Sequence, residues 1–349
     1  MPTAPSTSRL SSQAAPALSV TVPTWGRPDL LDRALRSVVG QRGAPADRIE
    51  LLVSDNSPDL DEAIVTSILT RWPGPTRYLP NRPDIGAIPN FNQCVEQARG
   101  RYVLLLHDDD YLLPDSLAAI VGTLDGASDD DEAILFGAHV VDMAGHVRRR
   151  QVFRRPVRMS PQQAMRRVLT DSSFVRIPAI VIRRDVLLAV GGFDVEVKNP
   201  TDFDLFIRVF ARRGVKCVPA ATAAYTVHAE AATSGMFHEG TIETLATVFD
   251  RAVKTGVLPE AIVRRCEADW FHQFILGGTY RLLRVGDQAQ ARRVFALFGS
   301  PRVSRLGLSR RWFPVRLLFS ALLSLPAAIA GPVMLLVGRL SPERLWMPM

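Results

Sequence analysis

The sequence predicts an α/β fold in which helices cover both faces of a mostly parallel central sheet. Between residues 17 and 123, short apolar runs alternate with longer segments of helical periodicity, as in repeated strand–helix units. The apolar runs are continuous, which is typical of parallel strands buried on both faces. The length of 349 residues leaves room for one large domain with an appendage, or for two domains.

Each element expected in this first half has a local signal. The segment PDLLDRALRSVVGQ (28–41) places Leu31, Leu35 and Val38 on one helical face. Further helices are expected near 60–72 and 89–99. The expected strands are 18–25, 49–56, 76–81 and 101–108.

Elements of the second half are less regular. The run EAILFGAHVVD (132–142) predicts a strand, Gly145 a turn into a hairpin, and residues 215–228 another strand. TDFDLFIR (201–208) predicts the start of a helix, with Thr201 as its N-cap and Gly214 at its end. Residues 240–300 show helical patterns.

The charge of the chain is unevenly distributed. Residues 281–316 contain nine arginines and one acid, a local charge of +8, so the rest of the chain is close to neutral although the total is +7. Only three of the 42 basic residues are lysine, and no basic module interleaved with aromatic residues is present, so nucleic-acid binding is not expected. The three cysteines are far apart, which disfavours a disulfide framework or a structural zinc site and favours a reducing cytoplasm.

The C-terminal region contains a run of 22 residues without a charge, LLFSALLSLPAAIAGPVMLLVG (317–338). About 20 apolar residues can cross a bilayer core, but Pro326 and Pro332 argue against one straight helix. A buried pair of core helices and a membrane-associated tail are both compatible with this run. Arginines just upstream favour anionic lipid and would keep the preceding domain on the cytoplasmic side.

Polar residues follow three of the expected strands, in the segments 24–27, 55–57 and 108–110. Ligands of parallel α/β sheets bind beyond the carboxyl ends of the strands. Asp108, Asp109 and Asp110 are the most unusual of these residues, because they follow an apolar strand too buried to be an edge. A solvated acidic turn is the alternative, but the central position favours carboxylates that hold Mg²⁺ or Mn²⁺.

Three other positions allow two interpretations each. Asp55 could bind a ribose or base, or form an Asx turn in Asp-Asn-Ser-Pro. Trp25 could stack on a base or pack against the protein. Asp202 could act as a general base, or complement the dipole at the start of its helix.

One family shares these motifs in this order. Over residues 18–230 the chain resembles the family 2 glycosyltransferases, in the runs VTVPTWGRPDLLDRALRSVVGQ, LLVSDNS, NRPDIGAIPNFNQCVEQARGRYVLLLHDDDYLLP, GGFD and TDFDLFIR. The resemblance implies a Rossmann-related GT-A fold and an inverting, metal-dependent transfer from a nucleotide-diphosphate sugar to an acceptor hydroxyl. It also implies a site for each matching residue. Pro23, Thr24, Trp25, Arg27, Asp55, Asn81, Gly86, Asn90 and Asp108 would bind the donor; Asp109, Asp110 and His228 would hold Mn²⁺ or Mg²⁺; and Asp202 would be the catalytic base.

The chain departs from the family pattern at two positions. His107 stands where many members carry the first aspartate of a DxD motif, and Thr201 stands where a glutamate usually precedes the catalytic aspartate. A catalytically decayed sugar-nucleotide-binding or scaffold protein is therefore one alternative. A nucleotidyltransferase is another, although PTWGRP is a poor match to the glycine-rich loop expected of that class.

The expected domain organisation follows from these motifs. Residues 1–16 form a disordered leader without the apolar core of a signal peptide, and 17–235 form the catalytic domain, with a nucleotide-binding half (17–123) and an acceptor-side half (124–235). A helical extension (236–300) and a membrane-associated tail (301–349) complete the chain. We expect a membrane-associated enzyme on the cytoplasmic side of the cell membrane, with a glycan or lipid-linked acceptor from cell-envelope or polysaccharide synthesis.

Overall fold

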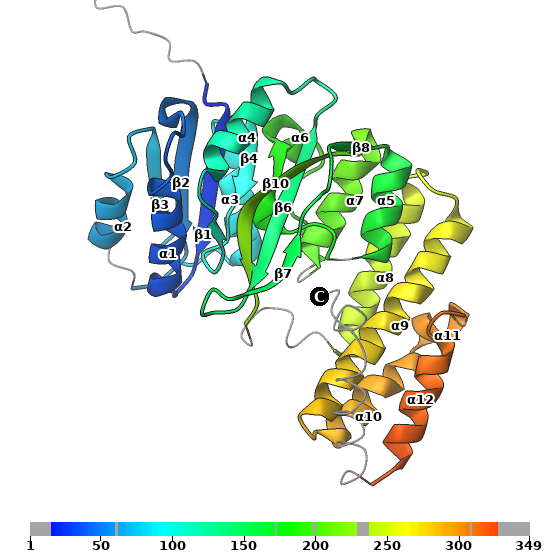
Figure 1. The fold of residues 1–349 in the computed structure, drawn as a ribbon. Helices are drawn as coiled ribbons and strands as arrows, with labels where there is room; N and C mark the ends of the chain where they lie inside the picture. Colours follow the sequence, from blue (N-terminus) through cyan, green and yellow to red (C-terminus); the bar gives the residue numbers. More distant parts are fainter. Residues whose placement is uncertain are drawn as a thin grey trace, which may run out of the picture.

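The structure is a computed structural model and describes residues 15–59, 62–171, 173–197, 200–228, 237–307 and 309–326. Figure 1 shows a sheet with helices on both faces, and an arm of helices that extends from one end of this body. The predicted α/β class is confirmed. Residues 1–14 of the expected leader lie outside the described residues.

The first half of the chain forms the predicted parallel sheet. Its strands β1 (Leu18–Thr24), β2 (Ile49–Asp55), β3 (Thr76–Pro80) and β4 (Tyr102–Leu105) lie in the order β3-β2-β1-β4, and every neighbouring pair is parallel. The connecting helices are α1 (Pro28–Val39), α2 (Glu62–Leu69) and α3 (Ala87–Gln97). Parallel register brings the carboxyl ends of these strands to one edge of the sheet.

Beyond β4 the sheet is mixed, so the prediction of a mostly parallel sheet is wrong for the second half. Strand β9 (Ile180–Arg183) lies between β4 and β6 (Ala133–Val141) and is antiparallel to both. A strand covered on both faces is continuously apolar in either direction, so the pattern cannot distinguish the two arrangements. Strand β10 (Val215–Thr226) is parallel to β6, and the short strand β5 (Tyr111–Leu112) is antiparallel to β10.

The predicted hairpin after residue 142 is confirmed. Strand β7 (Val147–Gln151) pairs antiparallel with β6, and Gly145 in the connecting turn has a φ of 83°. Strand β8 (Val157–Met159) adds to β10. The other helices of the body are α4 (Ser116–Asp125), α5 (Pro161–Thr170), α6 (Arg184–Ala189) and α7 (Thr201–Arg213), with short 3₁₀ turns η1 (Ala46–Arg48) and η2 (Ile177–Ala179).

The helical patterns of residues 240–300 are confirmed as the arm seen in Figure 1. Its elements are α8 (Glu239–Lys254), α9 (Glu260–Arg284), α10 (Gln288–Ala296), η4 (Leu297–Gly299), α11 (Pro301–Arg305) and α12 (Phe313–Ser324). Helix α9 packs against α5 and α8, and α8 also packs against α7. One cluster of buried apolar residues runs from α5 and α7 into α8, α9 and α12, so the arm shares a core with the body.

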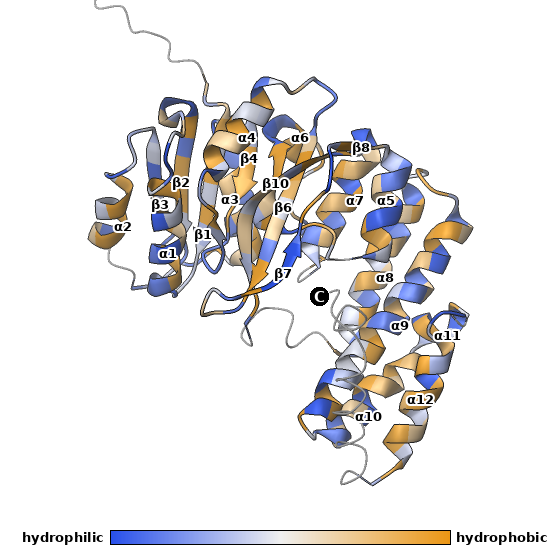
Figure 2. Ribbon diagram, in the orientation of Figure 1, coloured by the Kyte–Doolittle hydropathy of each residue, from blue (hydrophilic) through white to orange (hydrophobic). Residues whose placement is uncertain are grey.

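Helix α12 carries the described part of the apolar C-terminal run. Among the described residues, no helix has both the length and the apolar character needed to span a bilayer. Phe319, Leu322 and Leu323 are buried, whereas Leu317 and Leu318 are exposed; Figure 2 shows the helix as predominantly hydrophobic. The run beyond residue 326 lies outside the described residues.

Helix α7 is held in place by a buried carboxylate in its first turn. Asp204 is fully buried and accepts from Arg208 Nε at 2.8 Å and from Arg251 Nη1 of α8 at 2.9 Å. Arg208 also donates to Val190 O and Gly192 O in the turn before the helix. Thr201 is not the N-cap, since it is already helical and its hydroxyl donates to Asp194 O at 3.2 Å; Gly214 ends the helix as predicted.

We expect Asp204→Asn to lower the free energy of unfolding by about 2–4 kcal/mol, because it removes the charge that pairs with two partly buried arginines. The change is measured by urea denaturation of the full chain. Asp130→Asn serves as the control, since Asp130 is exposed and its carboxylate lies 3.6 Å from the exposed Arg213. A loss no larger than that of the control would show that the ion pairs contribute little.

Candidate active site at the carboxyl ends of the strands

Three carboxylates follow β4 at the edge where the parallel strands end, and each has different partners. Asp108 is buried; its carboxylate accepts from Thr24 Oγ1 at 2.7 Å and from Arg27 Nη2 at 2.5 Å. Burial raises the pKa of Asp108 to about 6, although Arg27 and Thr24 oppose the shift. The predicted donor residues Thr24, Arg27 and Asp108 therefore lie together.

Asp109 is the more accessible of the three, with a side chain that is 19% exposed. Its Oδ2 lies 3.1 Å from Arg27 Nη1 and 3.1 Å from His228 Nε2. Burial opposes ionisation, but His107, His228 and Arg27 together hold the pKa of Asp109 below its ordinary value. Asp109 is thus an ionised carboxylate near solvent.

Two buried polar atoms beside Asp109 have no hydrogen-bond partner within the described part of the chain. They are Oδ2 of Asp110, whose Oδ1 accepts from the backbone N–H of Thr226 at 2.7 Å, and Nε2 of His107. Burial lowers the pKa of His107, which favours the neutral imidazole, and the ring stacks on Phe91 with centroids 5.0 Å apart. One ligand atom from each of His107, Asp109 and Asp110 lies within 4.8 Å of the others.

This donor set fits a divalent cation, because carboxylate oxygens suit Mn²⁺ or Mg²⁺, neutral imidazole is a common metal ligand, and one atom of each of Asp110 and His107 has no partner among the described residues. The predicted metal residues Asp109 and Asp110 lie in this cluster. Among the described residues, the third member is His107 and not the predicted His228, which instead contacts Asp109 from the side. The sequence signal that could have indicated His107 as the third metal residue was its position directly before the three aspartates.

Asp55 is engaged by the protein itself. Its Oδ1 accepts from the N–H of Ser57 at 2.7 Å, which is the Asx turn allowed by the sequence, and its Oδ2 accepts from Tyr78 Oη at 2.7 Å and Arg82 Nη2 at 3.0 Å. Burial, followed by the hydrogen bond to Asp55, raises the pKa of Tyr78. Asp55 fixes the loop after β2 and lies at the predicted edge.

The predicted asparagines join the neighbouring loops. Asn81 Nδ2 donates to Asn56 Oδ1 at 2.8 Å and lies 3.4 Å from Asn90 Oδ1; Asn90 Nδ2 in turn donates to Ser54 O at 3.2 Å. Gly86 is the N-cap residue of α3 and has a φ of 88°, which favours glycine. These contacts set the shape of the rim between β2 and α3.

The segment after β1 lies at the same edge. Pro23 and Thr24 pair with Ser54 and Asp55 of β2. Trp25 is 58% exposed, so the alternative in which it packs against the protein is wrong. Its indole is available at the surface near Asp108.

Asp202 lies in the first turn of α7. Its Oδ1 accepts from the N–H of Phe203 at 2.7 Å, and burial raises the pKa of its carboxyl group. Its charge also acts on Tyr225, which adjoins Thr226 on β10 and is affected by Asp110 and Asp109 as well. The structure therefore brings Asp202 to the side of the cluster that β10 forms.

Two arginines of this site were not predicted. Arg33 Nη2 donates to Asp109 O at 2.5 Å and to Thr226 Oγ1 at 3.1 Å, which ties α1 to the loop after β4. Arg176 lies over the Tyr225 ring, with its Cζ 4.4 Å from the ring centroid, and its charge acts on both Asp110 and Asp202. Arg33 lies within the run 20–41 that carries the family resemblance, but no pattern there singles it out, and Arg176 lies in none of the motifs.

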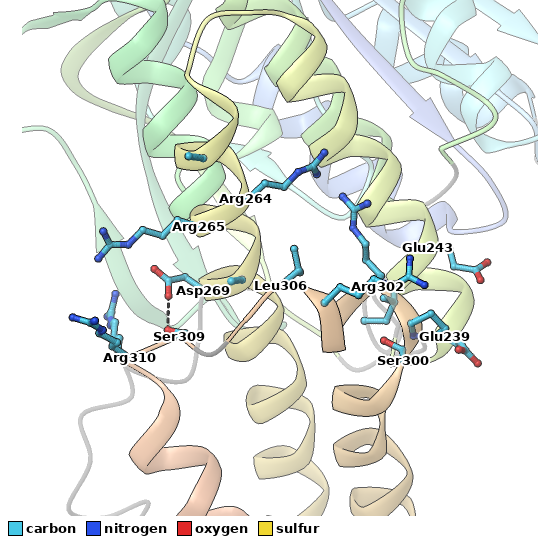
Figure 3. Close-up of a pocket in the computed structure, with 16 residues that line it drawn as sticks. Glu239, Glu243, Arg264, Arg265, Asp269, Ser300, Arg302, Leu306, Ser309 and Arg310 are labelled. Atoms are coloured by element: carbon cyan, nitrogen blue, oxygen red, sulfur yellow. Dashed lines mark hydrogen bonds between the residues drawn. The ribbon is translucent and has the colours of Figure 1, made fainter.

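A large pocket lies elsewhere, in the arm. It has a volume of about 1020 Å³, and α8, α9, α11 and the segment before α12 line it (Figure 3). Its charges are mixed: Arg264 and Arg302 bind Asp250 and Glu267, and further arginines and acidic residues such as Glu239 line it. None of the residues predicted for the chemistry lines it, so volume alone does not identify the site.

Comparison with known proteins gives two kinds of match to sequences. Residues 19–191 match the family described as "Glycosyl transferase family 2". The uncharacterized protein MT1568 of Mycobacterium tuberculosis is 29% identical over 217 residues, which are 59% of this chain and 66% of that protein. The GalNAc(5)-diNAcBac-PP-undecaprenol β-1,3-glucosyltransferase of Campylobacter jejuni is 32% identical over 133 residues, 38% of this chain and 41% of that enzyme. The match thus spans less than two thirds of the length of either relative.

Solved structures share the fold. TarS residues 1–349 of S. aureus in complex with UDP-GlcNAc have a TM-score of 0.59 at 20% identity, over 80% of this chain and 83% of that one. The mannosyltransferase PcManGT of Pyrobaculum calidifontis, in complex with GDP-Man and Mn²⁺, has a TM-score of 0.51 at 17% identity, over 93% and 88%. The expected GT-A-like fold is confirmed by these likenesses, and by its domain in residues 19–191 the chain belongs to glycosyl transferase family 2.

Proposed function

We propose that the protein is an inverting, metal-dependent glycosyltransferase that moves a sugar from a nucleotide diphosphate to an acceptor hydroxyl. Family membership supports a transferase that uses a nucleotide-sugar donor. Metal dependence and inversion are supported by the cluster of His107, Asp109 and Asp110, two atoms of which are buried without a partner among the described residues. Asp202 lies near the β10 side of this cluster.

The donor would lie along the ends of β1, β2 and β4. Trp25 is exposed and would stack on the base, and the rim formed by Asn81 and Gly86 would bound the donor beside it. Arg27 lies across Asp108 and Asp109, so it supplies positive charge where a diphosphate would bind. A divalent cation held by His107, Asp109 and Asp110 would neutralise the charge that develops on the leaving diphosphate.

Asp202 is proposed as the general base. Its raised pKa, caused by burial, makes the ionised carboxylate a better proton acceptor than an exposed aspartate. The carboxylate takes the proton of the acceptor hydroxyl as its oxygen bonds to the anomeric carbon, and the bond from that carbon to the diphosphate oxygen breaks. A single displacement inverts the configuration and needs no enzyme nucleophile.

The arm would bring the enzyme to the cytoplasmic surface of a membrane. Helix α12 exposes Phe313, Leu317 and Leu318, and Arg310 and Arg311 precede it. Such a combination suits anionic lipid at an interface. The named acceptor of the Campylobacter relative is linked to PP-undecaprenol, and we propose a lipid-linked acceptor, as in cell-envelope glycan synthesis, for this chain.

Asp202→Asn is expected to reduce transfer by about 10²–10⁴-fold while leaving nucleotide affinity unchanged, because it removes only the proton acceptor. Transfer is measured as release of the nucleoside diphosphate, and affinity by calorimetry. Asp129→Asn, an exposed carboxylate, is the matched control. Turnover equal to that of the wild type would remove Asp202 from the role of base; no turnover in the wild type with donor bound would favour the scaffold alternative.

A thermal-shift panel of UDP-, GDP- and dTDP-sugars with and without Mn²⁺ tests the donor and the metal. We expect Tm to rise with one nucleotide class and only when Mn²⁺ is present, because a ligand that binds the native state stabilises it. His107→Ala is expected to lose the Mn²⁺-dependent part of the shift. His146→Ala, in the exposed turn after β6, is the control. An unchanged shift in His107→Ala would return the third metal position to His228.

Flotation with vesicles that contain anionic phospholipid tests the membrane surface. We expect the Leu317→Glu/Leu318→Glu variant to bind at least tenfold more weakly than the full-length wild type, because each leucine withdrawn from the lipid costs roughly 1.5–3 kcal/mol. Val285→Glu is the control, since Val285 is 77% exposed at the end of α9. Wild-type protein that stays out of the vesicle fraction would refute the proposal.

A further inference from the structure

Arg176 is a buried cation without a hydrogen-bonding partner in the part of the chain that the structure describes. The residue is 9% exposed and immediately precedes η2, which leads into β9. Its Nε–H is buried and donates to no partner among the described residues, where its guanidinium also makes no ion pair. The one contact recorded for this group is the Tyr225 ring, 4.4 Å from Cζ.

A guanidinium in this setting is costly unless an anion compensates it. The carboxylates that act on Arg176 are Asp171 and Asp110, and Arg176 itself acts on Asp202; none of the three is within ion-pairing distance of it. Structural arginines elsewhere in the chain differ, since Arg208 and Arg251 directly bind Asp204. The five N–H donors of Arg176 therefore remain available to a planar or tetrahedral anion.

The position of Arg176 shows which substrate would supply that anion. Arg176 covers the ring of Tyr225, which precedes Thr226, whose N–H donates to Asp110, and the charges of Arg176 and Asp110 act on each other, so Arg176 lies near the cluster of His107, Asp109 and Asp110 on the β10 side. The opposite side, near β1, already has Arg27 at Asp108 and Asp109. Arg149 on β7 is the other cation that acts on Arg176. Arg149 and Arg176 both belong to the half of the domain that carries Asp202.

We propose that Arg176 binds an anionic group of the acceptor, a phosphate or a carboxylate, and so holds the acceptor hydroxyl at Asp202. This inference rests on the proposed function and adds to it the chemical class of the acceptor. The donor diphosphate is served by Arg27 and the metal cluster. An acceptor that carries negative charge near its attacking hydroxyl is therefore the substrate that this site fits.

The test uses the full-length chain and inorganic phosphate as the probe. Phosphate is titrated in a thermal-shift or calorimetric assay, with the protein alone and with saturating UDP or GDP and Mg²⁺ present. Because a hydrogen bond to a charged group contributes about 1.5–3 kcal/mol, we expect Arg176→Gln to weaken phosphate binding about 10–100-fold. Arg176→Lys is expected to recover part of this affinity, and Arg150→Gln on the exposed face of β7 is expected to bind like the wild type.

The titration with nucleotide present shows whether Arg176 binds the phosphates of the donor or an anionic group of the acceptor. We expect nucleotide affinity to be the same in Arg176→Gln and in the wild type, and phosphate still to bind when the nucleotide site is full. Loss of nucleotide affinity in the variant, or displacement of phosphate by the nucleotide, would assign Arg176 to the donor and overturn the inference. Equal phosphate binding in all variants would also overturn it. Absence of nucleotide binding in the wild type would instead count against the proposed function. Phosphate binding is also measured without nucleotide, so this failure is distinguishable from a failure of the inference about Arg176.

Discussion

The compensation of carboxylate charge at the end of β4 is the constraint on which the rest of the site depends. Three adjacent aspartates would repel one another, and each is stabilised differently: Asp108 by Thr24 and Arg27, Asp109 by Arg27 and His228, and Asp110 by a backbone N–H of β10. These partners come from β1, the segment after it and the end of β10. The arrangement therefore needs both halves of the sheet to be in register before it is stable.

Much of the fold could be predicted because its signals are local. Apolar runs, a helical stripe from Leu31 to Val38, and glycines at turns identified the strands and helices of the first half within a few residues. The direction of β9 could not be predicted, since its burial between β4 and β6 gives the same apolar pattern in either direction. Strand order in that region is decided by tertiary packing that no short segment encodes.

The site shows the same division. The aspartates, Asn81 and Gly86 stand in motifs that a reader of the sequence can find, and the structure places them at one edge. The roles proposed for them remain predictions. The sequence marked His107 only as a departure from the family pattern and did not mark Arg176 at all, because what indicates a binding role for each is an unpartnered buried atom. That property depends on residues far away in the chain, such as Phe91 and Tyr225.

Helix α7 shows how one short motif can serve both stability and chemistry. Residues two apart on a helix point in nearly opposite directions, about 160° apart around the axis. In T-D-F-D the second aspartate, Asp204, faces Arg208 and Arg251 and fastens the helix to α8, while Asp202 is left to face the β10 side of the strand ends. The shared core between body and arm holds this geometry, since Phe203, between the two aspartates, stacks on Trp270 of α9. A shift of the arm against the body would consequently move Asp202 relative to the cluster of His107, Asp109 and Asp110, so in the proposed reaction the arm would help to set the geometry even where it touches no substrate.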